Sequence, residues 1–171
     1  MIIGIVCVDE KWGIGKNNDL LFHLPKDLRL FKQITSDSIV VCGYNTLLSF
    51  PGSKPLRGRS TICLCPPEVE RDDCFCVHSF EKFVRLVKEL SKTQHVYVIG
   101  GATLYKSMLP YYDNVFVNKV QADGNAEVFF PNLDENPDFE VLFTDEVITD
   151  GDYQTQLVEY ISKERNAWGK Y

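Results

Sequence analysis

Short apolar runs alternate with amphipathic helical patterns along most of this chain, and this alternation limits the possible folds more than any other feature. The apolar runs lie at residues 2–8, 39–42, 61–65, 96–99 and 115–120. Several are apolar without interruption, which is typical of central parallel strands buried on both faces. Helical patterns lie between them, at residues 25–35, 44–50, 79–90 and 102–109, the last ended by Pro110. The alternation predicts right-handed crossovers and a sheet covered on both faces.

The C-terminal part lacks a helical period. Residues 139–143, 147–148 and 154–161 are typical of strands, and Asp150-Gly151 is a hairpin signal. A length of 171 residues with 44% hydrophobic content suits one globular domain. We therefore expect a single-domain α/β fold with a mostly parallel central sheet of about eight strands, antiparallel strands at one edge and about four helices. The domain is expected to span residues 1–161, followed by a C-terminal tail at residues 162–171.

Charge and hydropathy exclude two classes of partner. The chain has 18 basic and 24 acidic residues, so its surface has no general affinity for polyanions such as nucleic acids. No apolar run approaches the roughly 20 residues that span a bilayer, and the first residues lack a basic segment and a cleavage site. We expect a cytoplasmic protein without a membrane partner. No sustained heptad pattern is present, so a monomer is expected.

Six cysteines are present, and their spacing does not favour metal binding. They include two C-x-C pairs, and in a strand the two thiols of each pair would lie on one face, with their α-carbons about 6 to 7 Å apart. Structural zinc sites usually use C-x2-4-C spacing instead. We predict reduced thiols that pack as small hydrophobic side chains, and no metal, for the residues Cys7, Cys42, Cys63, Cys65, Cys74 and Cys76.

An acidic residue, Asp27, lies in the middle of the apolar face of the helix at residues 25–35. An ionised carboxylate without a partner is costly in such a position. One interpretation is that Asp27 satisfies the helix N-terminus, where Pro25 suits the first position. The other is a pocket carboxylate that binds a cationic or amidine-like ligand group and has a perturbed pKa. The residues alone leave both interpretations open.

Residues 9–24 form a long segment that neither periodicity explains, with glycines at Gly13 and Gly15. Segments of this length are commonly lids or binding loops, although a solvated connector is the alternative. Two strands also run directly into glycines that precede helices, at Gly43 and at Gly100-Gly101. The free amides at two such helix starts could hold a pyrophosphate, or the glycines could serve tight packing. Neither segment matches the G-x-G-x-x-G or P-loop pattern.

Taken together, these segments resemble dihydrofolate reductase. The motifs that carry the resemblance occur in family order over about residues 1 to 160: WGIG at residues 12–15, LPKDLRLFK at 24–32, Gly43 with Thr46, KPLRGR at 54–59, VIGGATLY at 98–105 and VFFP at 128–131. The resemblance implies the dihydrofolate reductase-like fold and reduction of 7,8-dihydrofolate to 5,6,7,8-tetrahydrofolate by hydride transfer from NADPH. Such a reaction serves one-carbon metabolism and the synthesis of thymidylate and purines, and antifolate-type inhibitors are expected ligands.

The resemblance also implies residue roles. Asp27 would be the catalytic residue, holding the amidine-like edge of the pterin and promoting protonation of N5. Arg59 would pair with the α-carboxylate of the glutamate tail. The full expected substrate site comprises Ile5, Val6, Cys7, Asp27, Leu28, Phe31, Phe50, Leu56, Arg59, Ile99, Tyr105 and Asn118.

The expected cofactor site lies along the strand ends and the loop. Gly100, Gly101 and Thr46 would carry the pyrophosphate, and the loop would fold over the nicotinamide with Leu20 in contact. The full set comprises Cys7, Ile14, Gly15, Asn18, Leu20, Gly43, Tyr44, Asn45, Thr46, Ser49, Leu64, Cys65, His78, Ile99, Gly100, Gly101, Ala102, Thr103, Leu104 and Tyr105.

Several positions depart from the family pattern. Phe22 stands where many relatives have a Trp that orients a water, and Asn118 replaces a Thr that bonds the same carboxylate. Tyr44 stands where an Arg that binds the 2′-phosphate is usual, with Thr103 and Pro66 at two further altered positions. The choice between NADPH and NADH therefore stays open here. Two alternative functions are a folate- or dinucleotide-binding protein that has lost catalysis, and a reductase of another pterin or of a ribosylaminopyrimidine.

Overall fold

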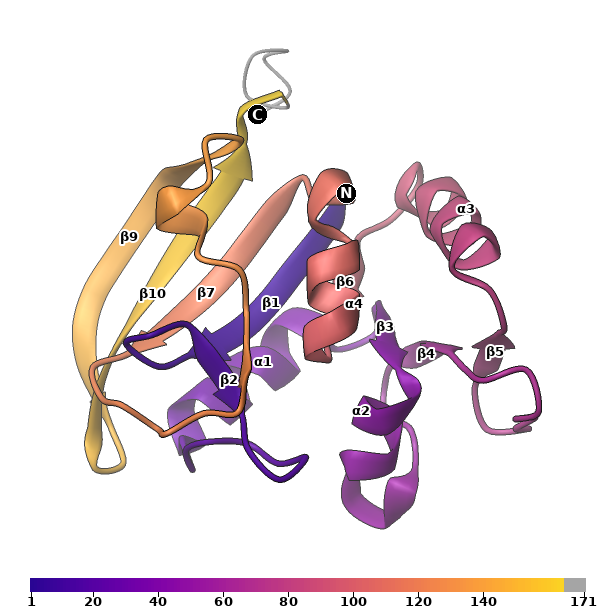
Figure 1. The fold of residues 1–171 in the computed structure, drawn as a ribbon, viewed down its shortest axis with the longest axis horizontal. Helices are drawn as coiled ribbons and strands as arrows, with labels where there is room; N and C mark the ends of the chain where they lie inside the picture. Colours follow the sequence, from indigo (N-terminus) through magenta and orange to yellow (C-terminus); the bar gives the residue numbers. More distant parts are fainter. Residues whose placement is uncertain (165–171) are drawn as a thin grey trace.

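The computed structural model describes residues 1–164 and contains one large mixed sheet flanked by helices (Figure 1). The strands are β1 (Ile2–Val8), β2 (Gly13–Gly15), β3 (Ile39–Gly43), β4 (Ser60–Leu64), β5 (Phe75–Val77), β6 (Val96–Val98), β7 (Asn114–Val120), β8 (Val128–Phe129), β9 (Phe139–Asp150) and β10 (Tyr153–Ser162). The helices are α1 (Pro25–Thr35), α2 (Tyr44–Ser49), α3 (Phe80–Ser91) and α4 (Ala102–Ser107), with short 3-10 turns η1 (Pro51–Ser53), η2 (Leu109–Tyr111) and η3 (Leu133–Glu135).

The large sheet has eight strands in the order β5-β4-β3-β6-β1-β7-β10-β9. The first six pair in parallel, and β10 pairs antiparallel with both β7 and β9. The prediction of a mostly parallel sheet with antiparallel C-terminal strands at one edge and about four helices is confirmed. Strands β2 and β8 form a separate two-stranded sheet.

Alternation of side chains along β3 shows how the two faces of the sheet are covered. Val41 packs in the cluster that contains residues of α3 and α4, whereas Val40 and Cys42 belong to clusters on the opposite face. That opposite face is covered by Ile34 of α1 and Leu47 of α2. The strands are therefore buried on both sides, which is why their sequences are continuously apolar. Among the helices in residues 1–164, none combines the length and apolar character that a bilayer crossing requires.

Two helix boundaries differ from the predicted ones for local reasons. Phe50 lies outside α2, with an extended backbone at ψ 157°, because the following Pro51 disfavours a helical conformation in the residue before it. Ser79 is the N-cap of α3 rather than its first residue, and its hydroxyl accepts a hydrogen bond from the amide of Lys82 at 3.2 Å. Helix α4 ends at Ser107, and Pro110 lies in the 3-10 turn that follows.

The C-terminal strand prediction is partly wrong, because residues 139–150 form one continuous strand. The polar segment Thr144 to Glu146, which separated the two predicted pieces, is exposed on this edge strand and so needs no apolar face. Register shifts between β9 and β10 let the long strand follow its partner. β10 extends to Ser162, and residues 165–171 of the expected tail lie outside the described residues.

The start of α1 is capped by a residue distant in sequence. Its N-cap, Leu24, has no side chain that can accept a hydrogen bond. The carboxylate of Asp150, at the end of β9, instead accepts the backbone amides of Lys26 at 3.0 Å and of Asp27 at 2.9 Å. Asp150 is only 1% exposed, so these charge-assisted bonds are shielded from water. The turn at Gly151, with φ 59°, places this carboxylate against the helix.

We expect Asp150→Ala to lower the free energy of unfolding by about 2 kcal/mol, because two buried amides lose their acceptor. Urea denaturation followed by circular dichroism would measure the loss. Asp145→Ala is the matched control, since Asp145 is exposed on the same strand. Equal midpoints for the two variants would contradict the capping role of Asp150.

Candidate active site

Asp27 faces the sheet from the first turn of α1. Its Oδ1 accepts a hydrogen bond from the side-chain amide of Asn118 on β7, with a donor–acceptor distance of 2.8 Å. Asn118 is paired in register with Cys7 on β1, so α1 crosses the sheet where these two parallel strands lie side by side. Because Asp150 satisfies the helix amides, the carboxylate of Asp27 is not engaged in capping. The interpretation of Asp27 as a helix cap is therefore excluded.

The surroundings of Asp27 disfavour charge. Burial raises the pKa of Asp27, the nearby carboxylate of Asp150 raises it further, and the hydrogen bond from Asn118 lowers it in part. Burial and the same carboxylates also raise the pKa of the Cys7 thiol. The hydroxyl of Tyr105, whose pKa is raised chiefly by burial, donates to the carbonyl oxygen of Ile5 at 2.7 Å. Asp27 thus lies beside the neutral side chains of Asn118, Cys7 and Tyr105, with the capping carboxylate of Asp150 nearby.

An arginine that forms no ion pair within residues 1–164 lies beside α1. The guanidinium of Arg59 stacks over the ring of Phe31 at 5.9 Å, and its Nη1 donates to Thr35 Oγ1 at 3.3 Å. Its Nε is buried and makes no hydrogen bond within residues 1–164, where no carboxylate forms an ion pair with it either. Burial lowers the pKa of Arg59. A half-buried cation with a spare donor is suited to bind an anion.

The ends of β3 and β6 meet at the predicted glycines. The amide of Gly43 donates to the carbonyl oxygen of Gly100 at 2.8 Å, which joins the starts of α2 and α4. A Cβ on Gly101 would lie 3.0 Å from Thr46 Oγ1, so a larger residue there would crowd the junction. The first-turn amides of both helices have no side-chain cap. This donor set and close approach of backbone fit a pyrophosphate group.

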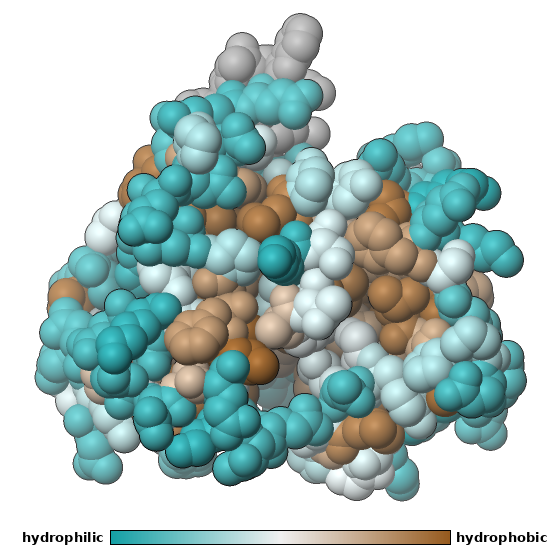
Figure 2. All heavy atoms as spheres, viewed as in Figure 1, coloured by the Kyte–Doolittle hydropathy of each residue, from teal (hydrophilic) through white to brown (hydrophobic). Residues whose placement is uncertain are grey.

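The segment at residues 9–24 is more ordered than its sequence suggests. Its β2 pairs with β8, and the carboxylate of Asp9 holds its base by accepting the amides of Lys11, Gly13 and Gly124 at 2.7 to 3.0 Å. Further along, the Asn18 side chain donates to the carbonyl oxygen of Asn45 at 3.4 Å. The surface in Figure 2 is hollowed between this segment and α2. The tip is strongly exposed, with Leu20 at 65%, and so is Lys11 near the base.

The remaining predicted cofactor residues gather at one edge of the sheet. They lie at the carboxyl ends of four neighbouring parallel strands, β5, β4, β3 and β6, where ligands commonly bind in open α/β sheets. On and after these ends stand Tyr44, Asn45, Thr46, Ser49, Leu64, Cys65, His78, Ile99, Ala102, Thr103 and Leu104. Of the predicted substrate residues, Phe50 and Leu56 are half-buried and Leu28 is 43% exposed.

Sequence reasoning missed two carboxylates that support the site. Asp150 was interpreted only as part of a hairpin signal, and Asp9 only as part of a loop. Both are almost completely buried and both bind backbone amides. The available signal was weak: an aspartate directly after an apolar strand, as at Asp9, and an aspartate next to the hairpin glycine, as at Asp150. At the altered position Phe22, the ring packs against Tyr153 with centroids 4.7 Å apart.

We expect Asp27→Asn to raise the melting temperature at neutral pH and to change it little well below pH 4. The folded-state pKa of Asp27 is above its unfolded value, so the ionised carboxylate destabilises the fold as pH rises through that range. Differential scanning calorimetry from pH 3 to pH 8 would measure the difference. A melting temperature gain that is equally large in acid would contradict the assigned direction of the pKa.

Comparison with known proteins agrees with this arrangement. The family model described as dihydrofolate reductase matches residues 1–163. The dihydrofolate reductase of Bacillus subtilis is 35% identical over 80% of this chain and 79% of its own length, and that of Haemophilus influenzae is 33% identical over 70% and 72%. The structure of dihydrofolate reductase from Enterococcus faecalis complexed with NADP(H) and RAB-propyl superimposes with a TM-score of 0.82, at 28% identity, covering 95% of this chain and 96% of that one. The chain therefore belongs to the dihydrofolate reductase family.

Proposed function

We propose that this chain reduces 7,8-dihydrofolate to 5,6,7,8-tetrahydrofolate with Asp27 as the catalytic residue and with the residues around it forming the pterin site. The family membership carries the reaction: the chain is an NADPH-dependent dihydrofolate reductase. The observation that supports the residue assignment is the buried carboxylate of Asp27, which is free of the helix cap and held by Asn118 at 2.8 Å.

Asp27 has two tasks in this proposal. Its carboxylate accepts hydrogen bonds from the amidine-like edge of the pterin, a planar pair of donors that suits two carboxylate oxygens. It also favours protonation of N5, because a carboxyl group whose pKa is raised by burial exchanges protons closer to neutral pH. Asn118 keeps the carboxylate in place and limits the rise of its pKa.

When bound, NADPH supplies the hydride. The junction of Gly43, Gly100 and Gly101 with Thr46 would hold its pyrophosphate, since backbone amides and one hydroxyl converge there. The segment that carries Asn18 and Leu20 would cover the nicotinamide and exclude water. Phe22 retains an aromatic contact but offers no hydrogen-bond donor, so any water beside Asp27 is oriented by other groups.

Arg59 would bind the α-carboxylate of the glutamate tail. Its guanidinium has no acidic partner within residues 1–164, and its Nε is a buried donor without an acceptor. Binding a carboxylate there would satisfy this donor. A site for a carboxylate near the proposed pterin site favours folate over pterins without a tail. The proposed pterin site is also where antifolate-type inhibitors are expected to bind.

Replacing Asp27 should abolish most turnover at neutral pH without unfolding the protein. Asp27→Ala removes both the proton-handling group and a buried charge, so the fold is expected to persist. Activity should recover in part as pH falls, because solution then supplies the proton. The measurement is steady-state oxidation of NADPH with dihydrofolate from pH 5 to pH 8. Near-normal turnover at pH 7 would show that Asp27 is not catalytic.

Arg59→Leu should raise the KM for dihydrofolate by the equivalent of about 1.5 to 3 kcal/mol, the value of charge-assisted hydrogen bonds, with a smaller effect on kcat. Binding of a pterin that lacks the glutamate tail should change little, which serves as the internal control. The matched variant is Arg57→Leu, since Arg57 is exposed two residues away. If both variants weakened dihydrofolate and the tail-less pterin equally, the tail would bind elsewhere.

A further inference from the structure

The segment between β4 and β5 contains an unusual set of charges. Residues 66–74 include four carboxylates, Glu68, Glu70, Asp72 and Asp73, and a single cationic residue, Arg71. Residues 70–73 line a surface hollow of about 500 Å³. None of these side chains has a part in the proposed catalytic chemistry. Arg71 nevertheless connects this segment to the edge of the sheet where the cofactor is expected to bind.

The guanidinium of Arg71 is fixed from two directions. Its Nε and Nη2 donate to the two carboxylate oxygens of Asp73 at 2.8 and 2.7 Å, and Nη2 also donates to the carbonyl oxygen of Ser53 at 2.7 Å. The side chain is only 18% exposed, although it lies in a loop. Within residues 1–164, Nη1 donates no hydrogen bond. The Nη1 group of this ordered guanidinium therefore remains available to a further acceptor.

Arg71 lies beside Tyr44, the residue that stands where the family usually has its phosphate-binding arginine. The guanidinium of Arg71 lies close enough to Tyr44 and Cys74 to interact with both electrostatically. Tyr44 and Cys74 in turn both pack against the cluster that contains Leu47 and Cys65. The same segment contacts His78, whose Nε2 lies 2.7 Å from the carbonyl oxygen of Val69.

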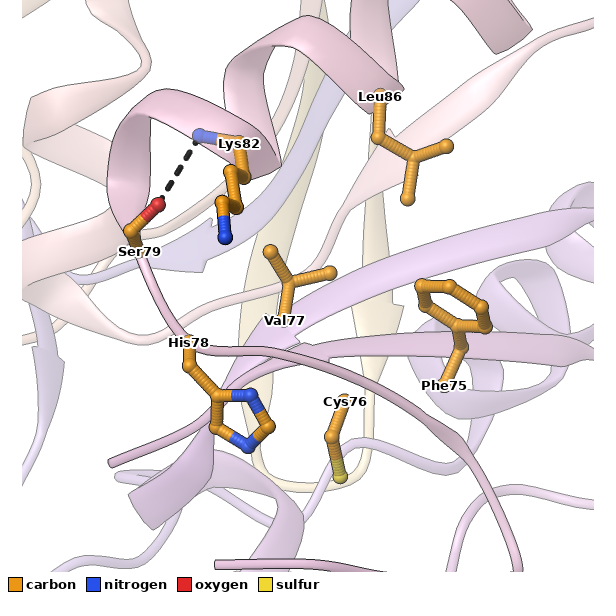
Figure 3. Close-up of a pocket in the computed structure, with 7 residues that line it drawn as sticks. All are labelled: Phe75, Cys76, Val77, His78, Ser79, Lys82 and Leu86. Carbon is orange, nitrogen blue, oxygen red and sulfur yellow. Dashed lines mark hydrogen bonds between the residues drawn. The ribbon is translucent and has the colours of Figure 1, made fainter. Parts of the chain in front are cut away.

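The orientation of β5 agrees with this placement. Figure 3 shows Cys76 and Val77 pointing to opposite sides of the strand, with Val77 directed toward Leu86 of α3. Cys76 therefore lies on the face that α2 covers, where it packs against the cluster that contains Leu47 and Cys65. The segment at residues 66–74 thus closes the α2 side of the sheet next to the expected adenosine end of the cofactor.

We propose that Arg71, held by Asp73, is the residue that recognises the 2′-phosphate of NADPH in this chain, in place of the arginine that Tyr44 replaces. The inference rests on the proposed cofactor site and adds a residue to it. Arg71 supplies the positive charge, and the Tyr44 hydroxyl supplies a neutral donor beside it. Asp73 has an opposing effect: it orients the guanidinium but repels the phosphate, while Lys54 nearby offsets part of that repulsion.

The test is direct binding of 2′,5′-ADP and 5′-AMP by isothermal titration calorimetry, because these ligands differ only in the 2′-phosphate and report no catalytic step. Arg71→Gln should weaken the binding of 2′,5′-ADP by about tenfold to a hundredfold and leave the binding of 5′-AMP unchanged, since one charged contact is lost. Asp73→Asn should strengthen the binding of 2′,5′-ADP several-fold, because Asn still accepts a hydrogen bond but carries no charge. Arg85→Gln is the matched control, as Arg85 is exposed on α3 and paired with Glu81.

The ionic strength gives a second readout. The preference of the unmodified protein for 2′,5′-ADP over 5′-AMP should fall as salt is raised from about 0.05 to about 0.5 M, and Arg71→Gln should remove most of that dependence. Equal weakening of both ligands by Arg71→Gln, or no change in their ratio, would overturn the proposal. Failure of the proposed function would look different, since the unmodified protein would then not oxidise NADPH with dihydrofolate.

Discussion

The contact between the carboxylate of Asp150 and the first amides of α1 is the interaction on which the arrangement of the site depends. Pro25 suits the first position of the helix, but no side chain at the N-cap can accept the amides that follow. In many helices an acidic residue of the first turn fulfils this task. Here a buried aspartate from the end of β9 fulfils it, with bonds of 2.9 and 3.0 Å. The first-turn Asp27 is released to face the sheet, where Asn118 meets it.

The same contact explains part of the electrostatics. Two carboxylates, Asp27 and Asp150, lie close together; burial raises the pKa of Asp27, and the carboxylate of Asp150 raises it further. Asp150 has two backbone amides that stabilise its charge, whereas Asp27 has one side-chain amide. The carboxyl group with the raised pKa, Asp27, is the one that faces the sheet beside Asn118. The residue proposed to act on the substrate is therefore one whose ionised form lowers the stability of the fold.

Much of the fold follows from the sequence because the dominant signal is periodic. Continuous apolar runs such as residues 39–42 and 96–99 require burial on both faces, and the helices between them supply the cover. The prediction is weakest where pairing rather than burial defines a strand. Strand β5 has an exposed residue, Phe75, and only three residues, and Thr144 to Glu146 continue β9 through polar side chains. Strand β5 is too short, and Thr144 to Glu146 too polar, for periodicity to detect.

The candidate site likewise contains some residues that local sequence identifies and others that it does not. Asp27 was singled out because a carboxylate in an apolar helix face is anomalous, and the glycines at Gly43 and Gly100 because they follow buried strands. The supporting carboxylates Asp9 and Asp150 each bind at least one backbone amide more than one hundred residues away in sequence, a contact that no local pattern encodes. Arg71 belongs to the same class, since its neighbours Ser53 and Tyr44 are set by the packing of α2 against the sheet. Local sequence therefore identifies the groups whose charge or burial is anomalous. The groups that position them can be identified only in the fold, where distant strand ends meet at one edge of the sheet.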